Sequence, residues 1–147
     1  MAPPFVVLMV EDDHATLSLL AAIAKREGFE ALLAADGAKA LAFVTQQPVD
    51  AVVLDLLLPE ISGFEILRYF NRRTPALLER TIVITAASEQ AYQDCEELLH
   101  VRRFYRKPLD FIDLTSALHA CRAAQARDAG EGLSLPPATR VPKHDAS

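Results

Sequence analysis

The hydrophobic pattern of this chain changes period repeatedly, and this alternation constrains the fold more than any other feature. Short apolar runs of strand length alternate five times with segments whose apolar residues recur at helical spacing. The predicted strands cover residues 5–10, 29–34, 49–55, 81–85 and 103–106, and the predicted helices cover 14–27, 37–47, 64–73, 88–100 and 110–127. Because a helix follows each strand, we expect a parallel sheet with right-handed crossovers and helices on both faces.

Capping and turn residues support these boundaries. Gly28 suits the position after the first helix, because glycine readily adopts the left-handed conformation that often ends helices. Asp36 and Ser88 are residue types that cap helix amino termini, and Pro48 ends the second helix. The pattern as a whole predicts an α/β fold: a doubly wound, five-stranded parallel sheet with the flavodoxin-like strand order 2-1-3-4-5.

The length of the chain fits one domain, and its last part differs in composition from the rest. A chain of 147 residues can bury a substantial core without disulfides or structural metals. From Asp128 onward, glycines and prolines stand among small and polar residues without an apolar period. We therefore expect a folded domain over residues 1–127 and a flexible tail over residues 128–147.

Charge, cysteine usage and hydropathy argue against several functional classes. The net charge of −5 disfavours general nucleic-acid binding, which needs a basic face. Cys95 and Cys121 follow neither a metal-ligand spacing nor a disulfide pattern, which favours a reducing compartment. The amino terminus lacks the basic start of a signal peptide, and no run reaches the roughly 18–20 apolar residues of a membrane span. We expect a cytoplasmic protein without membrane contact.

Carboxylates stand at the ends of two predicted strands that we expect to be neighbours. Glu11 and Asp12 directly follow the first strand, and Asp55 ends the third. With the order 2-1-3-4-5, these strand ends meet at the edge where open α/β sheets bind ligands. Three crowded carboxylates repel one another, and a divalent cation would neutralise them. Mg²⁺ prefers oxygen ligands, and the backbone carbonyl of Leu57 could complete the set.

Two further strand ends supply groups that suit a phosphoryl group. Thr85 ends the fourth strand, and Lys107 follows the fifth. The Thr85 hydroxyl can donate a hydrogen bond, and the Lys107 ammonium provides a positive charge. Asp55 would then act as a nucleophile and become an aspartyl phosphate. Mg²⁺, Thr85 and Lys107 would each meet one oxygen of the phosphoryl group.

Four segments carry a resemblance to a known family. They are Val7–Asp13, Val53–Pro59 with the later Gly63, Ile84–Ala86, and Lys107-Pro108. Over roughly residues 5–125, the chain resembles the receiver domains of bacterial two-component response regulators, in particular single-domain regulators of the chemotaxis type. The resemblance implies phosphoryl transfer to Asp55 from a histidine kinase or a histidine phosphotransfer protein.

The resemblance also implies a conformational switch. In the family, phosphorylation draws a Thr or Ser inward, here Thr85, and an aromatic residue three positions before the lysine follows it, here Phe104. The signal would pass to an unknown downstream protein through the face of the fourth helix, fifth strand and fifth helix. The domain would catalyse at most its own phosphorylation and dephosphorylation. We expect a monomer or a weak homodimer that acts without nucleic acid.

The chain departs from the family pattern at several positions. Glu11 replaces the more common aspartate, and its longer side chain should still reach a metal ion. The usual Gly-Ala before the fifth strand is absent, and four of the six residues in 102–107 are basic. Leu57 and Ala87 offer no acid or amide to position a hydrolytic water, which predicts a long-lived phosphate. The resemblance raises the expectation of a cis bond before Pro108 above the general frequency of about 5–6%.

Two other functions stay open at the level of sequence. The first is a pseudo-receiver that binds partners independently of phosphate, which the complete set of site residues disfavours. The second is a phosphohydrolase with Asp55 as its nucleophile. Enzymes of the haloacid dehalogenase type need an aspartate two residues after the nucleophile, and Leu57 occupies that position here. The sequence therefore favours a signalling module that phosphorylation controls.

Overall fold

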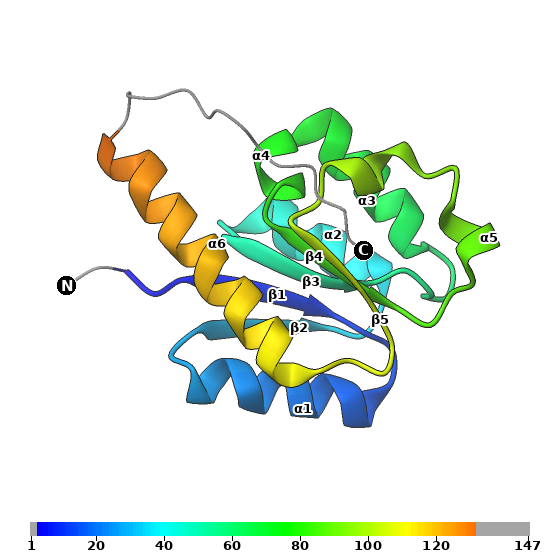
Figure 1. Cartoon of the computed structure of the whole chain (residues 1–147), viewed down its shortest axis with the longest axis horizontal. Helices are drawn as coiled ribbons and strands as arrows, with labels where there is room; N and C mark the ends of the chain where they lie inside the picture. Colours follow the sequence, from blue (N-terminus) through cyan, green and yellow to red (C-terminus); the bar gives the residue numbers. More distant parts are fainter. Residues whose placement is uncertain (1–2, 132–147) are drawn as a thin grey trace.

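A five-stranded parallel sheet forms the centre of the computed structural model, which describes residues 3–131 (Figure 1). The strands are β1 (Val6–Val10), β2 (Glu30–Ala34), β3 (Ala51–Asp55), β4 (Thr81–Thr85) and β5 (Arg103–Arg106). Their order is β2-β1-β3-β4-β5, and all of the pairings are parallel. The predicted fold class, strand positions and strand order are confirmed.

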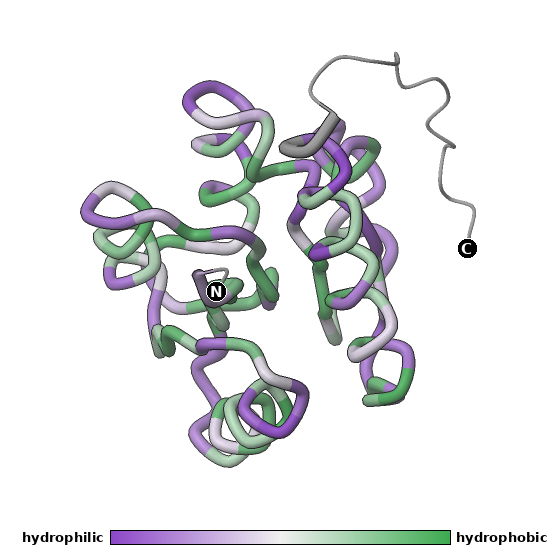
Figure 2. The backbone as a smooth tube through the Cα atoms, turned by 90° about the vertical axis from the view of Figure 1, so that its left-hand side faces the viewer, coloured by the Kyte–Doolittle hydropathy of each residue, from purple (hydrophilic) through white to green (hydrophobic). Residues whose placement is uncertain are grey.

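Helices cover both faces of this sheet. They are α1 (His14–Arg26), α2 (Gly37–Gln46), α3 (Gly63–Arg73), α4 (Pro75–Leu78), α5 (Glu89–Tyr92), the 3₁₀ helix η1 (Glu96–Leu99) and α6 (Phe111–Glu131). Apolar residues of α1 and α6 pack on one face of the sheet, and those of α2, α3 and α4 pack on the other. Figure 2 shows hydrophobic segments at the centre and hydrophilic residues mainly on the outer turns.

Strand alternation explains why there are two hydrophobic cores. Successive residues of a strand point to opposite faces of a sheet. Met9 of β1 accordingly lies in the core under α1 and α6, whereas Leu8 lies in the core under α2 and α3. Every residue of β3 and β4 is buried, as expected for central strands covered on both faces. The central position of β3 brings Asp55 to the middle of the carboxyl edge of the sheet.

Side-chain caps begin the three helices that follow β1, β2 and β3. Asp13 accepts a hydrogen bond from the Thr16 amide at 2.9 Å, and Asp36 accepts one from the Lys39 amide at 2.8 Å. The Thr16 hydroxyl also donates to Asp13, and these bonds hold the pKa of Asp13 below its ordinary value. Ser62 caps α3 in the same way. The caps confirm the predicted role of Asp36.

One predicted helix is wrong. Residues 88–100 do not form a single helix but two short ones, α5 and η1, separated by a turn around Asp94. Within the described part of the chain, neither α5 nor η1 contains a buried residue. Short helices draw most of their stability from tertiary packing, so this amphipathic pattern alone does not hold a continuous helix. Ser88 occupies the N-cap position, but its side chain makes no capping hydrogen bond with the described residues.

Two other helix boundaries differ from the prediction. The helix α4 was not predicted. Its residues Leu77 and Leu78 are buried in the core on the side of the sheet covered by α2 and α3, and this packing stabilises the short helix. The last helix, α6, continues to Glu131, so the predicted domain boundary at residue 127 falls inside a helix. Ala-rich sequence in this segment favours its helical continuation. The rest of the predicted tail, residues 132–147, lies outside the described residues.

Asp50 connects three distant segments at the amino edge of the sheet. Its carboxylate accepts hydrogen bonds from the amide of Val6 and from Nε2 of Gln125, each at 2.8 Å. Its backbone carbonyl accepts a hydrogen bond from Nε of Arg80. The start of β1, the second half of α6 and the residue before β4 therefore all bond to one residue, Asp50. Between residues 3 and 131, no helix has the length and hydropathy to cross a membrane.

Candidate functional site

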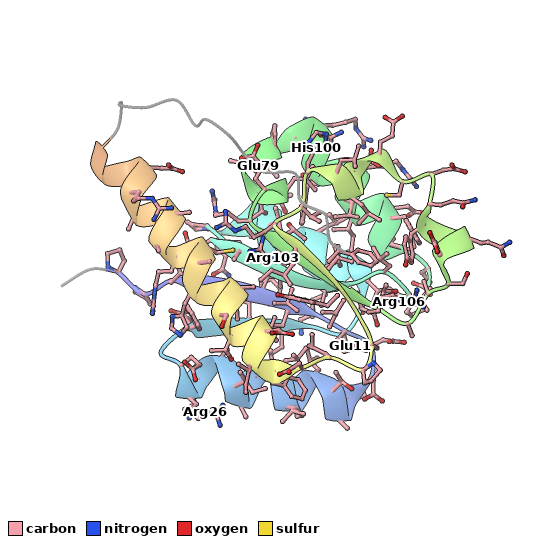
Figure 3. The ribbon with its side chains drawn as sticks, in the orientation of Figure 1. Glu11, Arg26, Glu79, His100, Arg103 and Arg106 are labelled. Carbon is pink, nitrogen blue, oxygen red and sulfur yellow. The ribbon has the colours of Figure 1, made fainter. Side chains whose placement is uncertain are left out.

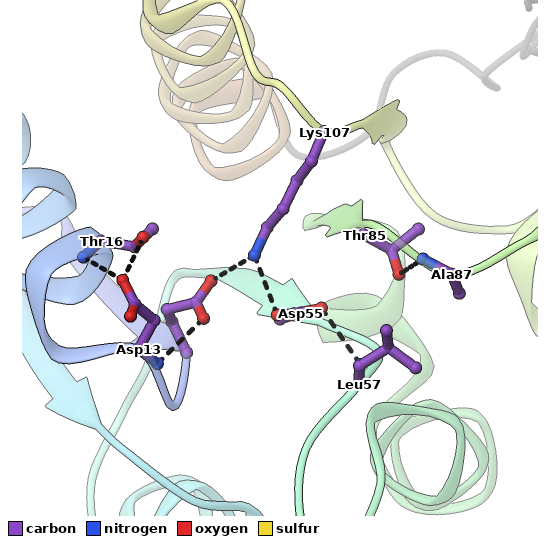
Figure 4. Close-up of polar contacts among 8 residues, drawn as sticks. Asp13, Thr16, Asp55, Leu57, Thr85, Ala87 and Lys107 are labelled. Carbon is purple, nitrogen blue, oxygen red and sulfur yellow. Dashed lines mark hydrogen bonds and ion pairs between the residues drawn. The ribbon is translucent and has the colours of Figure 1, made fainter.

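Four strands end at the predicted site, as the topology requires. Glu11 directly follows β1, Asp55 is the last residue of β3, and Thr85 is the last residue of β4. Lys107 follows β5, and its side chain extends toward Asp55 (Figure 4). All of these residues therefore gather at the carboxyl edge of the sheet, although almost 100 residues of chain separate Glu11 from Lys107.

Three carboxylates form the acidic part of the site. Oxygen atoms of Glu11, Asp12 and Asp55 lie within 4.8 Å of one another. Glu11 and Asp55 are almost fully buried, with 1% and 3% exposure, whereas Asp12 is exposed. Mg²⁺ takes oxygen ligands at about 2.0–2.1 Å, so ligands on opposite sides of the ion lie about 4 Å apart. The donor type and the spacing of these residues fit Mg²⁺, with the exposed side of the site left for water.

Lys107 links the two buried carboxylates. Its Nζ donates to Oε1 of Glu11 at 2.9 Å and to Oδ2 of Asp55 at 3.1 Å (Figure 4). Burial acts to lower the pKa of Lys107, but the hydrogen bonds to Glu11 and Asp55 outweigh it and raise the pKa above its ordinary value. The peptide bond between Lys107 and Pro108 is cis, which the resemblance led us to expect.

Burial at the site changes the acidity of Glu11. Desolvation raises the pKa of Glu11, and the hydrogen bond from Lys107 offsets this only in part. The second carboxylate oxygen of Glu11 accepts a hydrogen bond from the amide of Asp13 at 3.1 Å. Both oxygens of this longer side chain are thus engaged at the site, and the substitution of Glu for Asp preserves the acidic cluster.

Asp55 and Thr85 both make short-range contacts with their own loops. Oδ1 of Asp55 accepts a hydrogen bond from the amide of Leu57 at 3.1 Å. The hydroxyl oxygen of Thr85, which is fully buried, accepts one from the amide of Ala87 at 2.9 Å. Accepting this bond leaves the Thr85 hydroxyl hydrogen able to donate elsewhere. Each strand end is therefore fixed by the loop that follows it.

Two glycines allow the β3–α3 loop to fold against the site. A Cβ atom at Gly63 would lie 2.5 Å from the carbonyl oxygen of Asp55 and 2.5 Å from the Cα of Leu56. At Gly37, a Cβ atom would lie 2.5 Å from the carbonyl oxygen of Ile61. The sequence indicated Gly63 as part of a motif but not why a glycine is needed there, and it did not indicate a role for Gly37. No local signal identifies Gly37, because the atom that a Cβ would meet belongs to Ile61, in a later loop of the chain.

Phe104 lies away from the carboxylates and packs on another aromatic ring. Its ring centroid is 4.8 Å from that of Tyr92 in α5, at an interplanar angle of 54°. Nη1 of Arg106 donates to the Tyr92 hydroxyl at 3.3 Å. Sequence analysis did not identify Tyr92, because its partners belong to a strand that follows it in the chain. Phe104 therefore contacts an aromatic ring of α5, whereas Lys107 contacts the carboxylates of the site.

The basic residues of the fifth strand are separated along its length. Figure 3 shows Arg106 at the same end of the sheet as Glu11, with Arg103 farther along β5. Nη1 of Arg103 donates to the carbonyl of Arg102 at 2.9 Å. Nε of Arg102 is buried and has no hydrogen-bond partner among the described residues. Of these basic side chains, only Lys107 contacts the acidic site directly.

Comparisons with known proteins agree with this geometry. A family model of the response regulator receiver domain matches residues 7–119. Sensory transduction protein RegX3 of Mycolicibacterium smegmatis is 32% identical over 126 residues, which are 84% of this chain and 54% of RegX3. Sporulation initiation phosphotransferase F of Bacillus subtilis is 33% identical over 113 residues, which are 76% of this chain and 89% of that protein. The chain thus spans about half the length of RegX3 and most of the length of the Bacillus protein.

Solved structures share the fold. The response regulator TrrA of Thermotoga maritima, in complex with Mg(2+)-BeF, is 25% identical with a TM-score of 0.69, covering 79% of this chain and 97% of TrrA. A CheY-like receiver domain protein of Methanospirillum hungatei JF-1 is 23% identical with a TM-score of 0.72, covering 88% and 100% of the two chains. The family match, the strand order and the four strand ends lead to one conclusion: this chain belongs to the receiver domains of two-component response regulators.

Proposed function

We propose that Asp55 accepts a phosphoryl group from the phosphohistidine of a histidine kinase or a histidine phosphotransfer protein. The observation that carries this proposal is the placement of the Asp55 carboxylate, 3.1 Å from the Lys107 ammonium and beside Glu11 and Asp12. Asp55 stands at the centre of the carboxyl edge, and Asp12 forms the exposed side of the site. The family is one of signalling domains. The site would therefore accept one phosphoryl group per molecule rather than turn over a substrate.

The transfer requires one bond to form and one to break. A carboxylate oxygen of Asp55 attacks phosphorus, a P–O bond forms, and the P–N bond to the donor imidazole breaks. The bonding electrons leave with the imidazole, which takes up a proton. Lys107, already hydrogen bonded to Asp55 Oδ2, is positioned to meet a phosphoryl oxygen as negative charge arrives. Thr85 would donate its hydroxyl hydrogen to a second phosphoryl oxygen.

Mg²⁺ is the cofactor that this donor set fits. Glu11, Asp12, Asp55 and the backbone carbonyl of Leu57 would hold it, with water completing an octahedral set. When bound, the ion supplies positive charge that neutralises the carboxylates and the phosphoryl oxygens. Lys107 would remain necessary in this arrangement, because its ammonium is a second cation bonded directly to Asp55.

Phosphorylation would be transmitted through Thr85 and Phe104. Movement of the Thr85 hydroxyl toward a phosphoryl group would displace it from the Ala87 amide and alter the β4–α5 loop. Phe104 lies on the strand beside β4 and contacts Tyr92 in α5. The surface formed by α5, η1, β5 and α6 would therefore present the signal to a downstream protein. Output through protein contacts needs no nucleic-acid-binding face.

The proposal also covers the domain bounds, the oligomeric state, the cellular compartment and the lifetime of the phosphate. The receiver would cover residues 1–127, with residues 128–147 as a tail whose first residues continue α6. We expect a monomer or a weak homodimer in the cytoplasm. The absence of an acid or amide at Leu57 and Ala87 supports a long-lived phosphate.

Incubation with acetyl phosphate and Mg²⁺ tests the acceptor role of Asp55. Intact-mass analysis and a phosphate-affinity gel should show one phosphoryl adduct, lost on chelation of Mg²⁺ and in Asp55→Asn. Asp110→Asn, an exposed aspartate at the start of α6, is the matched control and should be phosphorylated normally. An adduct that persists in Asp55→Asn would refute the assignment. Absence of both an adduct and Mg²⁺-dependent beryllofluoride binding would favour the pseudo-receiver.

A further inference from the structure

A pocket of about 330 Å³ lies at the amino edge of the sheet, at the opposite end of β3 from Asp55. Residues from the end of α2, the connection between α2 and β3, the second half of α3 and the segment from α4 to the start of β4 line it. From Val49, which lines the pocket, to Asp55 the extended chain covers about 20 Å at roughly 3.3 Å per residue. The pocket is therefore separate from the phosphoryl-acceptor site.

The lining of this pocket carries positive charge in a protein of net negative charge. Arg73 and Arg80 both line it, and among the residues that the structure describes no Asp or Glu does. The chain as a whole has a net charge of −5. A ligand in this pocket would meet two guanidinium groups and no carboxylate of the lining, so the charge pattern favours an anionic ligand.

Arg80 is held in place by the protein backbone. The side chain is half-buried, and its Nε donates to the carbonyl oxygen of Asp50. This bond uses one of the five N–H groups of a planar guanidinium and fixes the orientation of the others. A guanidinium that is fixed in advance loses little conformational entropy when it binds a carboxylate or phosphate.

Arg73 is the more exposed of the two arginines. Its guanidinium carbon lies 6.0 Å from the ring centroid of Tyr69, another lining residue. Position in the last turn of α3 explains a basic residue here, because cations stabilise helix carboxyl ends. The same reasoning applies to Arg72, which does not line the pocket, and it does not explain Arg80, which lies outside α3. Helix stabilisation therefore accounts for one arginine at this cavity but not for both.

Apolar side chains form part of the remaining wall of the pocket, together with the neutral polar residues Thr45, Gln47 and Thr74. Val44, Val49 and Leu77 contribute to its walls, and Tyr69 adds an aromatic surface. We propose that this pocket binds a small organic anion: a carboxylate or phosphate monoester on an apolar or aromatic body, with the charged group between Arg73 and Arg80. Its volume lies at the lower end of the range of about 300–1,000 Å³ that is typical of small-molecule sites.

Titration of ¹⁵N-labelled protein with benzoate, phenyl phosphate and uncharged benzyl alcohol tests this site. For probes of this size we expect dissociation constants on the order of 1 mM. Benzoate and phenyl phosphate should shift the amides of Val49 and Thr74 and the Nε signal of Arg80, in a saturable way. Benzyl alcohol should bind at least about tenfold more weakly, because it makes no charge-assisted hydrogen bond.

Adjacent arginines on α3 provide a matched pair of variants. Arg73→Gln should weaken binding of both anions about tenfold, whereas Arg72→Gln should leave it unchanged. Any shifts of phenyl phosphate confined to residues around Lys107 would report the acceptor site and would overturn the proposal. Equal binding of benzyl alcohol, equal effects of the two variants, or no saturable shifts at the pocket would overturn it as well. None of these results bears on phosphorylation of Asp55.

Discussion

Lys107 controls the electrostatic balance of the site at the scale of single residues. Its ammonium bonds Glu11 and Asp55, both of which are nearly fully buried. Although burial opposes it, these bonds raise the folded-state pKa of Lys107 above the ordinary value of 10.5. Its contribution to stability is therefore complete below pH 10.5 and is lost as the pH rises through the higher folded-state pKa.

Replacement of Lys107 with methionine should remove this pH-dependent contribution. At neutral pH, we expect the free energy of unfolding to fall by about 1–3 kcal/mol, because two buried carboxylates lose their donor. Above pH 10.5, Lys107 of the wild-type protein loses its proton, and with it the contribution to stability that the variant lacks at every pH. The unfolding free energies of the two proteins should therefore converge. Urea unfolding of both proteins at neutral and alkaline pH measures this. A difference that stays constant across the range would contradict the assigned role.

Gly63 and Gly28 are needed for different reasons: Gly63 because there is no room for a side chain, and Gly28 because its backbone has a positive φ. Gly63→Ala places a Cβ atom 2.5 Å from backbone atoms of Asp55 and Leu56, so the β3–α3 loop must shift. We expect a loss of stability of about 2 kcal/mol or more and a large loss of phosphorylation. Gly28→Ala meets no atom within 4 Å but keeps an unfavourable φ of +87°, which costs about 1 kcal/mol.

Phosphorylation with acetyl phosphate and urea unfolding compare the two glycine variants. Gly28→Ala should be phosphorylated at the wild-type rate, since Gly28 follows the carboxyl end of α1, far from Asp55. Unchanged phosphorylation of Gly63→Ala would show that the loop does not position the acceptor. The two variants together distinguish a local effect on the site from general destabilisation.

The site residues could be predicted because their positions follow from topology alone. Parallel strand ends meet at one edge, so Glu11, Asp55 and Lys107 converge once the strand order is known. The partners of Phe104 could not be predicted in this way. Tyr92 reaches Phe104 only because α5 folds over β5, and that packing depends on where a broken helix lies.

The connection between β4 and β5 is the element that departs most from expectation. Residues 88–100 have helical spacing, yet they form α5 and η1 with partly buried contacts only. Strands were easier to predict than this helix, because continuous apolar runs are buried on both faces whatever covers them. The Tyr92–Phe104 contact ties this segment to the sheet, and Cys95 and Leu98 also pack against the core.

Loss of the Tyr92 ring should change how readily the domain adopts its phosphorylated state. If Phe104 leaves Tyr92 on phosphorylation, Tyr92→Ala should tighten binding of Mg²⁺ and beryllofluoride two- to tenfold, matching an aromatic pair worth about 0.5–1.5 kcal/mol. Tyr92→Phe keeps the stacking and loses only the Arg106 hydrogen bond, so its affinity should stay within about twofold of wild type. Weaker binding by Tyr92→Ala would mean that the contact favours the phosphorylated state.

Across the whole molecule, the two edges of the sheet have different tasks. The carboxyl edge gathers the acidic site, whereas the amino edge gathers hydrogen bonds that join distant segments. Asp50 lies at one end of β3 and Asp55 at the other. Asp50 and Asp55 bond to different residues, so we expect that stability and phosphoryl chemistry can be altered separately.

Asp50→Ala tests this separation. The variant leaves the Val6 amide and the Gln125 side chain without their acceptor, so we expect a loss of stability of about 2–3 kcal/mol. Asp50→Asn keeps one carbonyl oxygen and should lose about half as much. Hydrogen exchange should quicken in the turns of α6 around Gln125, because the helix loses its attachment to β1 and β3. Affinity for Mg²⁺ and beryllofluoride should remain within about twofold of wild type, since the change lies about 17 Å of strand away from Asp55. A large loss of that affinity in a folded Asp50→Asn variant would instead show that the two edges are coupled through β3.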